Sequence, residues 1–242
     1  MKKNKVVVFA IIFSIISLFF AINSFVFVLL QTKEKVISTS SIYNKGINYI
    51  VEVKALSDDV GESFGTGVVI SNDGKIITNA HVVTYTKLNK ESIFNEYYVR
   101  FAYEIDYRRV VLDRYDSDLD LAILKFVDVD SVSISPVCFG NVSKLNFGDR
   151  VFAMGNASNF GIGIFEGIIS VPKVNVELEG SIRNVIQCDL TIASGNSGGA
   201  LLNEKNELIG ITTFRLKDNS GKIIYGIVYC IPIDVVEQFI ND

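Results

Sequence analysis

Hydrophobic and polar positions divide the chain into one long apolar run and a series of short, strand-like segments. Residues 6–30 are apolar except for Ser14, Ser17, Asn23 and Ser24. At about 1.5 Å rise per residue, a helix over such a run reaches across a hydrocarbon core of roughly 30 Å. We therefore predict one N-terminal transmembrane helix over residues 6–30.

The residues before the apolar run indicate its orientation. Lys2, Lys3 and Lys5 precede it without an acidic residue, so the positive-inside rule puts residues 1–5 in the cytoplasm. The alternative is a cleaved signal peptide, whose apolar region is usually ~7–15 residues and ends at a small-residue site. This run is longer and Leu29-Leu30-Gln31-Thr32 lacks such a site. We favour an uncleaved signal anchor in the cell membrane, a linker over 31–46 and an extracytoplasmic domain over 47–242.

Beyond the linker, short runs rich in Val, Ile, Tyr and Phe alternate with turn residues, as β-strands do. Asn72-Asp73-Gly74 and residues 203–206 are the clearest predicted turns. One soluble helix is expected near the C-terminus, capped by Asp234, with Val235, Val236, Phe239 and Ile240 on its apolar face. The pattern predicts an all-β domain with strands near 49–55, 65–70, 75–78, 97–101, 107–112, 121–126, 150–155, 167–171, 185–189, 200–202, 208–214 and 223–231.

Charge and cysteine content exclude some classes of function. The chain has a net charge of −4, and without the five lysines and one glutamate of residues 1–35 the remainder carries −8. An acidic domain argues against nucleic-acid binding, which needs basic surface. The three cysteines, Cys138, Cys188 and Cys230, are expected to be small buried residues, with one disulfide as the alternative. Their spacing suits no metal site, and we predict neither a metal nor a cofactor.

Three segments carry the residues of a nucleophilic hydrolase. His81, the only histidine, follows Thr78-Asn79-Ala80, Asp120 opens an apolar stretch, and Ser197 lies in a glycine-rich segment. A serine hydroxyl needs a neutral imidazole as base, and the imidazole needs a carboxylate on its other nitrogen. We predict that Ser197 is the nucleophile, His81 the base and Asp120 the orienting carboxylate, preferred over Asp116 and Asp118 because it directly precedes an apolar stretch.

The segment around Ser197 also predicts an oxyanion hole. Gly195 and Gly198 permit backbone conformations that other residues resist. The backbone amides of Gly195, Asn196 and Ser197 can therefore converge on one point and stabilise a tetrahedral oxyanion.

At these motifs the chain resembles the trypsin-like (chymotrypsin-fold) serine proteases, most closely the HtrA/Deg type. The resemblance rests on segments 65–70 and 76–83 around His81, 120–125 around Asp120, 155–170, and 186–201 around Ser197. It implies two packed six-stranded antiparallel β-barrels with a C-terminal helix and the site between the barrels. By position it implies a primary specificity pocket with Ile192 at its floor and a wall formed by Thr212, Thr213, Phe214, Arg215 and Leu216.

The resemblance further implies polypeptide substrates and a homotrimer, for which residues 41–49 are the candidate contact segment. The PDZ domain common in this type is not expected within these 242 residues. The sequence thus predicts a membrane-anchored serine endopeptidase that cleaves unfolded or damaged proteins outside the cytoplasm. A non-catalytic polypeptide-binding module on a protease fold and a narrow-specificity processing protease are the alternatives.

Overall fold

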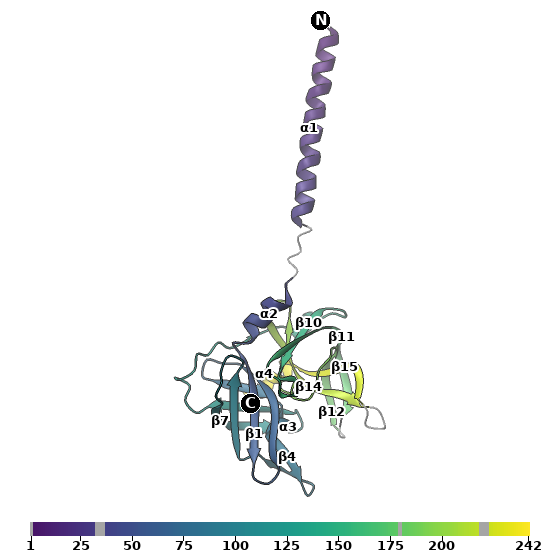
Figure 1. Cartoon of the computed structure of the whole chain (residues 1–242). Coiled ribbons are helices and arrows are strands. Elements are labelled where there is room, and N and C mark those ends of the chain that lie inside the picture. Colours follow the sequence, from purple (N-terminus) through teal and green to yellow (C-terminus); the bar gives the residue numbers. More distant parts are fainter. Residues whose placement is uncertain (1, 32–36, 179–180, 218–222) are drawn as a thin grey trace. The chain divides into compact units, whose positions relative to one another are not determined.

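The computed structural model describes residues 2–31, 37–178, 181–217 and 223–242 (Figure 1). The chain divides into two compact units, Met1–Ser38 and Thr39–Asp242.

The first unit consists of helix α1 (Lys2–Gln31). Many of its large apolar side chains are exposed, among them Phe9, Phe13 and Phe25. Within the part of the chain that is described, no helix has the length and hydropathy that a membrane crossing needs, so the span predicted at 6–30 is not confirmed.

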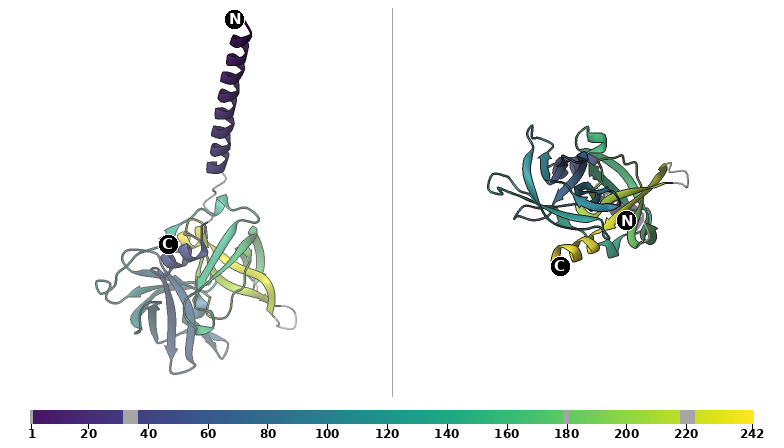
Figure 2. Two further views of the ribbon diagram at one scale, coloured as in Figure 1. Left: turned by 45° about the horizontal axis from the view of Figure 1, so that its top comes forward. Right: turned by 90° about the horizontal axis from the view of Figure 1, so that it is seen from below.

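The first half of the second unit is a closed antiparallel barrel, as predicted (Figure 2). Its strand order is β1-β2-β3-β8-β7-β6, and alternating apolar residues of these strands fill its interior, including the fully buried Phe101 and Ile76. The strands are β1 (Ile50–Ser57), β2 (Gly61–Val69), β3 (Lys75–Thr78), β6 (Glu96–Phe101), β7 (Arg108–Asp116) and β8 (Leu121–Phe126).

Residues 80–93 form a short insertion between β3 and β6. It contains the one-turn helix α3 (Ala80–Val83) and a separate hairpin of β4 (Thr84–Lys87) and β5 (Lys90–Ile93). Leu88 and Asn89 both have positive φ, as a tight two-residue hairpin turn requires. The strand pattern did not predict this hairpin, because its residues are mostly polar.

The second half forms a seven-stranded sheet in the order β13-β10-β11-β12-β15-β14-β9, in which β13 also pairs with β14. The second six-stranded barrel that was expected is not confirmed, and the sheet has a seventh strand because β9 adds in parallel to β14. Its apolar core includes Val151, Ile186, Leu201 and Ile209. The strands are β9 (Cys138–Phe139), β10 (Arg150–Gly155), β11 (Gly163–Leu178), β12 (Ser181–Asp189), β13 (Ala200–Asn203), β14 (Glu207–Lys217) and β15 (Ile223–Pro232), with 3-10 turns η1 (Val142–Lys144) and η2 (Ala157–Asn159).

Two helices pack against this unit. Helix α2 (Thr39–Gly46) contacts β10 and β11, buries Ile42, and lies inside the segment expected to be a linker. Helix α4 (Ile233–Asn241) closes the chain and buries Val236 and Phe239, as predicted. Its N-cap position is held by Pro232 rather than by the predicted Asp234, whose carboxylate accepts a hydrogen bond from Val235 N within the first turn.

The cysteines are all free, so no disulfide joins them. Cys188 and Cys230 are buried in the second core as expected, on neighbouring strands β12 and β15. A hydrogen bond with Cys188 and burial raise the pKa of the Cys230 thiol. Cys138 is exposed, contrary to expectation, because its strand β9 lies at the edge of the second sheet.

Candidate active site

His81 and Asp120 meet at one end of the first barrel. Helix α3 carries His81 directly after β3, and Asp120 immediately precedes β8, which pairs with β3. The His81 Nδ1 lies 2.9 Å from Oδ1 and 3.0 Å from Oδ2 of Asp120, and the backbone N of His81 donates to Oδ1 at 3.1 Å. Asn79 donates from Nδ2 to the Asp120 carbonyl at 2.8 Å, so both backbone and side chains hold the two segments in register.

Asp120 is the aspartate that faces the imidazole. Asp118 is exposed, and Asp116 accepts a hydrogen bond from Leu119 N in its own turn. Asp120 has a φ of 56°, a left-handed conformation that Asp and Asn adopt more readily than most residues. Burial raises the pKa of Asp120, but hydrogen bonds from His81 and Thr213 outweigh burial and leave that pKa below its usual value.

Ser197 comes from the second sheet, on the loop between β12 and β13. Gly195 and Gly198 have φ values of 93° and 81°, in the region that favours glycine. A β carbon at Gly195 would meet the Asn156 carbonyl O, and one at Gly198 would meet the Thr66 carbonyl O. Close packing and positive φ therefore both require glycine on either side of the Asn196-Ser197 pair.

The backbone amides of this loop do not all have the same role. Asn196 N donates to Ala193 O at 3.2 Å, which occupies one of the three predicted oxyanion donors. Within the described residues, the amides of Gly195 and Ser197 donate no hydrogen bond. These two amides are thus the ones available to a carbonyl oxygen.

The hydroxyl of Ser197 points to β14. Its Oγ donates to the Thr213 carbonyl O at 3.2 Å, and among the described residues no hydrogen bond joins it to His81. The Oγ1 of Thr213 donates to Oδ2 of Asp120 at 2.6 Å. Thr213 therefore contacts both the nucleophile candidate and the orienting carboxylate, a connection that the sequence reasoning missed.

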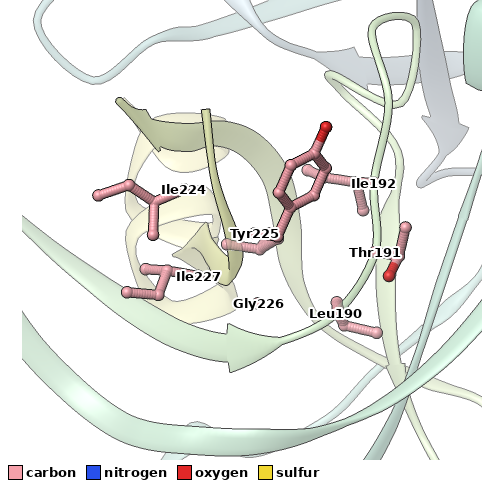
Figure 3. A pocket seen from close by; sticks show the side chains of 8 residues that line it. Leu190, Thr191, Ile192, Ile224, Tyr225, Gly226 and Ile227 are labelled. Atoms are coloured by element: carbon pink, nitrogen blue, oxygen red, sulfur yellow. The ribbon is translucent and has the colours of Figure 1, made fainter. Parts of the chain in front are cut away.

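A shallow, open pocket lies beside the Ser197 loop, between the segment after β12 and strand β15 (Figure 3). Its walls are mostly apolar, with Tyr225 and the predicted Ile192 among them. Gly226, with φ 77°, would bring a β carbon within 3.2 Å of Asp189 Oδ1. The lining residues are Leu190, Thr191, Ile192, Ile224, Tyr225, Gly226, Ile227 and Val228.

The other predicted pocket residues lie elsewhere along β14. Thr212 is fully buried and donates from Oγ1 to Asn196 O at 2.5 Å. Phe214 packs its ring against Tyr229, with ring centroids 5.0 Å apart. Arg215 and Leu216 belong to β14 by backbone, but their side chains lie outside the described residues. Gly226 interrupts an apolar strand. This glycine was the sequence signal that could have located the pocket wall at 224–228, which the sequence reasoning missed.

No group of three or more His, Cys, Asp or Glu side chains in the described part of the chain could hold a metal ion. The described residues place an imidazole–carboxylate pair on the first barrel, a hydroxyl and two amides without an acceptor among them on the second sheet, and an apolar pocket beside these groups. Such a set suits acyl transfer by a serine nucleophile.

Comparison with known proteins identifies the family. A family model described as the trypsin-like peptidase domain matches residues 65–211, which include His81, Asp120 and Ser197. The chain belongs to the trypsin-like peptidases. The similar proteins place this peptidase domain in the HtrA/DegS-type family.

The similar proteins are HtrA-type proteases from several organisms. "Serine endoprotease DegS" of Haemophilus influenzae is 34% identical over 180 residues, which cover 74% of this chain and 49% of the relative. "Serine protease HTRA4" of Mus musculus is 32% identical over 189 residues, which cover 77% of this chain and 35% of the relative. This trypsin-like peptidase spans about half or less of the length of these curated relatives.

A solved structure supports the same assignment. The "HtrA-type protease AlgW with tripeptide" superposes with a TM-score of 0.72 at 25% identity, covering 84% of this chain and 62% of that chain. The observed fold, a closed barrel and a second β-sheet followed by a C-terminal helix, is therefore that of an HtrA-type peptidase domain.

Proposed function

We propose that this protein cleaves polypeptides through a triad of Ser197, His81 and Asp120. The Ser197 Oγ bonds to the carbonyl carbon of the scissile peptide while His81 takes the hydroxyl proton. The carbonyl electron pair moves to oxygen, where the amides of Gly195 and Ser197 stabilise it. Collapse of this intermediate breaks the C–N bond, and His81 gives its proton to the leaving amine. Water then hydrolyses the acyl-enzyme by the same steps and restores Ser197.

The observation that carries this proposal is the His81–Asp120 hydrogen bond at 2.9 Å. The carboxylate is 9% exposed as a side chain and accepts from His81 and Thr213, so its lone pairs are directed to the imidazole and to one hydroxyl. A buried carboxylate on Nδ1 leaves Nε2 as the nitrogen that accepts the serine proton. Asn196, whose amide is bonded to Ala193 O, has no oxyanion role in this proposal.

The pocket supports a preference for small or medium apolar side chains before the scissile bond. Ile192 is its predicted floor, and Ile224, Ile227 and Val228 add apolar walls, which favour an apolar side chain over a polar one. In this proposal Thr212 acts on the Ser197 loop and Thr213 on Asp120. Phe214, Arg215 and Leu216 keep the wall role that the resemblance implies.

We also propose that residues 6–30 anchor the enzyme in the cell membrane. The apolar run and the three preceding lysines support this, with a cytoplasmic tail at 1–5 and the peptidase domain, which includes α2, outside the cytoplasm. One relative carries the name "Probable periplasmic serine endoprotease DegP-like". From this proposed location we infer that the substrates are unfolded or damaged proteins outside the cytoplasm.

A homotrimer is the assembly that the resemblance implies. Within the candidate contact segment 41–49, Ile42 and Tyr49 are buried in their own chain. The trimer contacts in this proposal therefore use the exposed residues of that segment, and sedimentation of the detergent-solubilised protein tests the mass of the assembly.

The test of the activity compares the full chain with its Ser197→Ala variant. Each is treated with a fluorophosphonate probe and with casein as an unfolded substrate. We expect labelling and cleavage by the wild type alone. Labelling without casein cleavage would favour the narrow-specificity processing protease. Absence of labelling in both would favour the polypeptide-binding module, a reading supported by the Ser197 hydroxyl's bond to the Thr213 carbonyl.

A further inference from the structure

Thr66 belongs to β2 of the first barrel, yet its polar groups bind two loops of the second sheet. Its side chain is fully buried. The Oγ1 donates to the Gly195 carbonyl O at 2.6 Å and accepts from Asn156 N at 2.8 Å, so the hydroxyl acts as both donor and acceptor. The backbone N of Thr66 donates to the Ser197 carbonyl O at 2.8 Å.

Thr66 is itself held in place by its own barrel. It pairs with Glu52 of β1, and its carbonyl O accepts from Thr78 Oγ1 at 2.7 Å. The loops also approach it closely, because a β carbon at Gly155 would lie 2.9 Å from its Oγ1. The rigid barrel therefore supplies a fixed donor to each of two carbonyls in the Ser197 loop.

These two carbonyls flank the nucleophile. Glycine has free backbone torsions, so Gly195 gives the loop no intrinsic preference for one orientation of the Gly195–Asn196 peptide. The hydrogen bond to the Gly195 carbonyl O fixes the orientation of the Gly195–Asn196 peptide. The hydrogen bond to the Ser197 carbonyl O fixes the peptide that follows Ser197. The Ser197 amide lies between these two carbonyls, and the Gly195 amide belongs to the residue whose carbonyl is the first of them.

We propose that Thr66 is a positioning residue for the oxyanion donors, acting from the first barrel on the loop of the second sheet. This rests on the proposed function, because it assumes that the amides of Gly195 and Ser197 stabilise the transition state. Removing the hydroxyl would let the Gly195–Asn196 peptide rotate and would misdirect those amides without touching the substrate pocket.

The test uses Thr66→Val, which keeps the shape but loses the hydroxyl, and Thr66→Ser, which keeps the hydroxyl but loses the methyl. In the full chain, the rate of fluorophosphonate labelling and the kcat and KM for a fluorescent casein are measured. Since loss of one oxyanion donor costs about 10²–10³ in kcat, we expect Thr66→Val to lower labelling and kcat by about 10–10² with little change in KM. We expect Thr66→Ser to retain most of both.

Ser57→Ala is the matched control, because it removes another buried hydroxyl of the first barrel, whose one hydrogen bond among the described residues is from Asp59 N. Should Thr66→Val not fold, Thr66→Cys replaces it, because its S–H is only a weak donor. Equal labelling of wild type and Thr66→Val would overturn the inference alone, as would equal losses in Thr66→Val and Thr66→Ser. A wild type that is no better labelled than Ser197→Ala would overturn the proposed function and this inference with it.

Discussion

The two halves of the peptidase domain hold their contributions to the site in different ways. In the first barrel, His81 and Asp120 lie next to paired strands and are joined by side-chain and backbone hydrogen bonds. In the second sheet, Ser197 lies on a loop whose shape depends on positive φ at Gly195 and Gly198. Its hydroxyl bonds to a carbonyl of its own sheet rather than to the imidazole.

The same chemistry places different requirements on the two halves. The base and carboxylate need a fixed distance, which a closed barrel provides. The nucleophile loop needs an unusual backbone, and its conformation is held by contacts from other segments, notably Thr66 and Thr212. Substitution of His81 or Asp120 should therefore abolish catalysis. Substitutions in the contacts between the halves should lower the catalytic rate by smaller factors.

The largest effect is expected when the carboxylate of the first barrel is lost. Asp120→Asn should lower kcat/KM on casein by about 10⁴, because the amide no longer holds the imidazole in the productive tautomer. Asn tolerates the left-handed φ at this position, so the fold should persist. Asp118→Asn, in the same loop but exposed, is the control. A loss below tenfold in Asp120→Asn would show that another group orients His81.

The stability of the first barrel should depend on a buried ion pair. Glu52, 3% exposed, accepts from Arg100 at 2.7 and 3.2 Å and from the Tyr107 hydroxyl at 3.0 Å. Glu52→Ala should lower the free energy of unfolding by about 2–4 kcal/mol, because it leaves a partly buried guanidinium unpaired.

Urea denaturation measures that change, and Glu62→Ala is its control. Glu62 of β2 pairs with Lys54 of β1, but its side chain is 48% exposed. Its loss should cost no more than about 1 kcal/mol. Equal losses of unfolding free energy in Glu52→Ala and Glu62→Ala would show that burial of Glu52 does not increase its contribution to stability.

A smaller effect is expected where the two halves meet at Thr213. Thr213→Val removes the 2.6 Å hydrogen bond to Asp120 and keeps the backbone carbonyl. A hydrogen bond to a charged group contributes ~1.5–3 kcal/mol, so kcat/KM should fall by about 10–10². Thr213→Ser should recover most of the activity. Failure of the serine variant to recover it would trace the loss to packing.

The smallest effect concerns the attachment of α2 to the second sheet. Hydrogen bonds from Arg150 and from Thr39 lower the pKa of Glu166 to about 2. Because this pKa lies below the unfolded value of ~4.3, the contribution to stability is present above that pH and is lost as pH falls toward 2. Glu166 is 42% exposed as a side chain, so Glu166→Gln should cost less than about 1 kcal/mol at neutral pH.

The unfolding free energy of wild type and Glu166→Gln, measured from pH 7 down to pH 2, checks this prediction. The difference between them should shrink as the pH falls. A difference that grows in acid would contradict the assigned direction of the pKa shift.

The sequence predicted those parts of the site that lie within continuous motifs. His81, Asp120 and Ser197 lie in segments whose residue types and order were enough to select them as candidates. The strands of the first barrel follow from alternating apolar residues. The roles of Thr66 and Thr213 were not predictable, because each depends on how the two halves pack against one another. The pocket wall at 224–228 was missed since it arises from the long-range pairing of β12 with β15.

Two smaller differences have local causes. Strand β9 comprises only Cys138–Phe139, too short for a periodic pattern, and its place at the sheet edge exposes Cys138. The amide of Asn196 was expected among the oxyanion donors, but the tight turn directs it to Ala193 O. Turn geometry of this kind depends on torsions that a Gly-Asn-Ser-Gly pattern permits but does not specify.

The most direct test of the account locates the residue that a fluorophosphonate modifies in the full chain. Mass spectrometry of the digested, labelled protein is compared between wild type, His81→Ala and Asp120→Asn. The account predicts an adduct on Ser197 in the wild type, its absence in His81→Ala and its slow formation in Asp120→Asn. An adduct on another residue, or labelling of Ser197 at an unchanged rate without His81, would contradict the central claim that the first barrel activates the nucleophile of the second sheet.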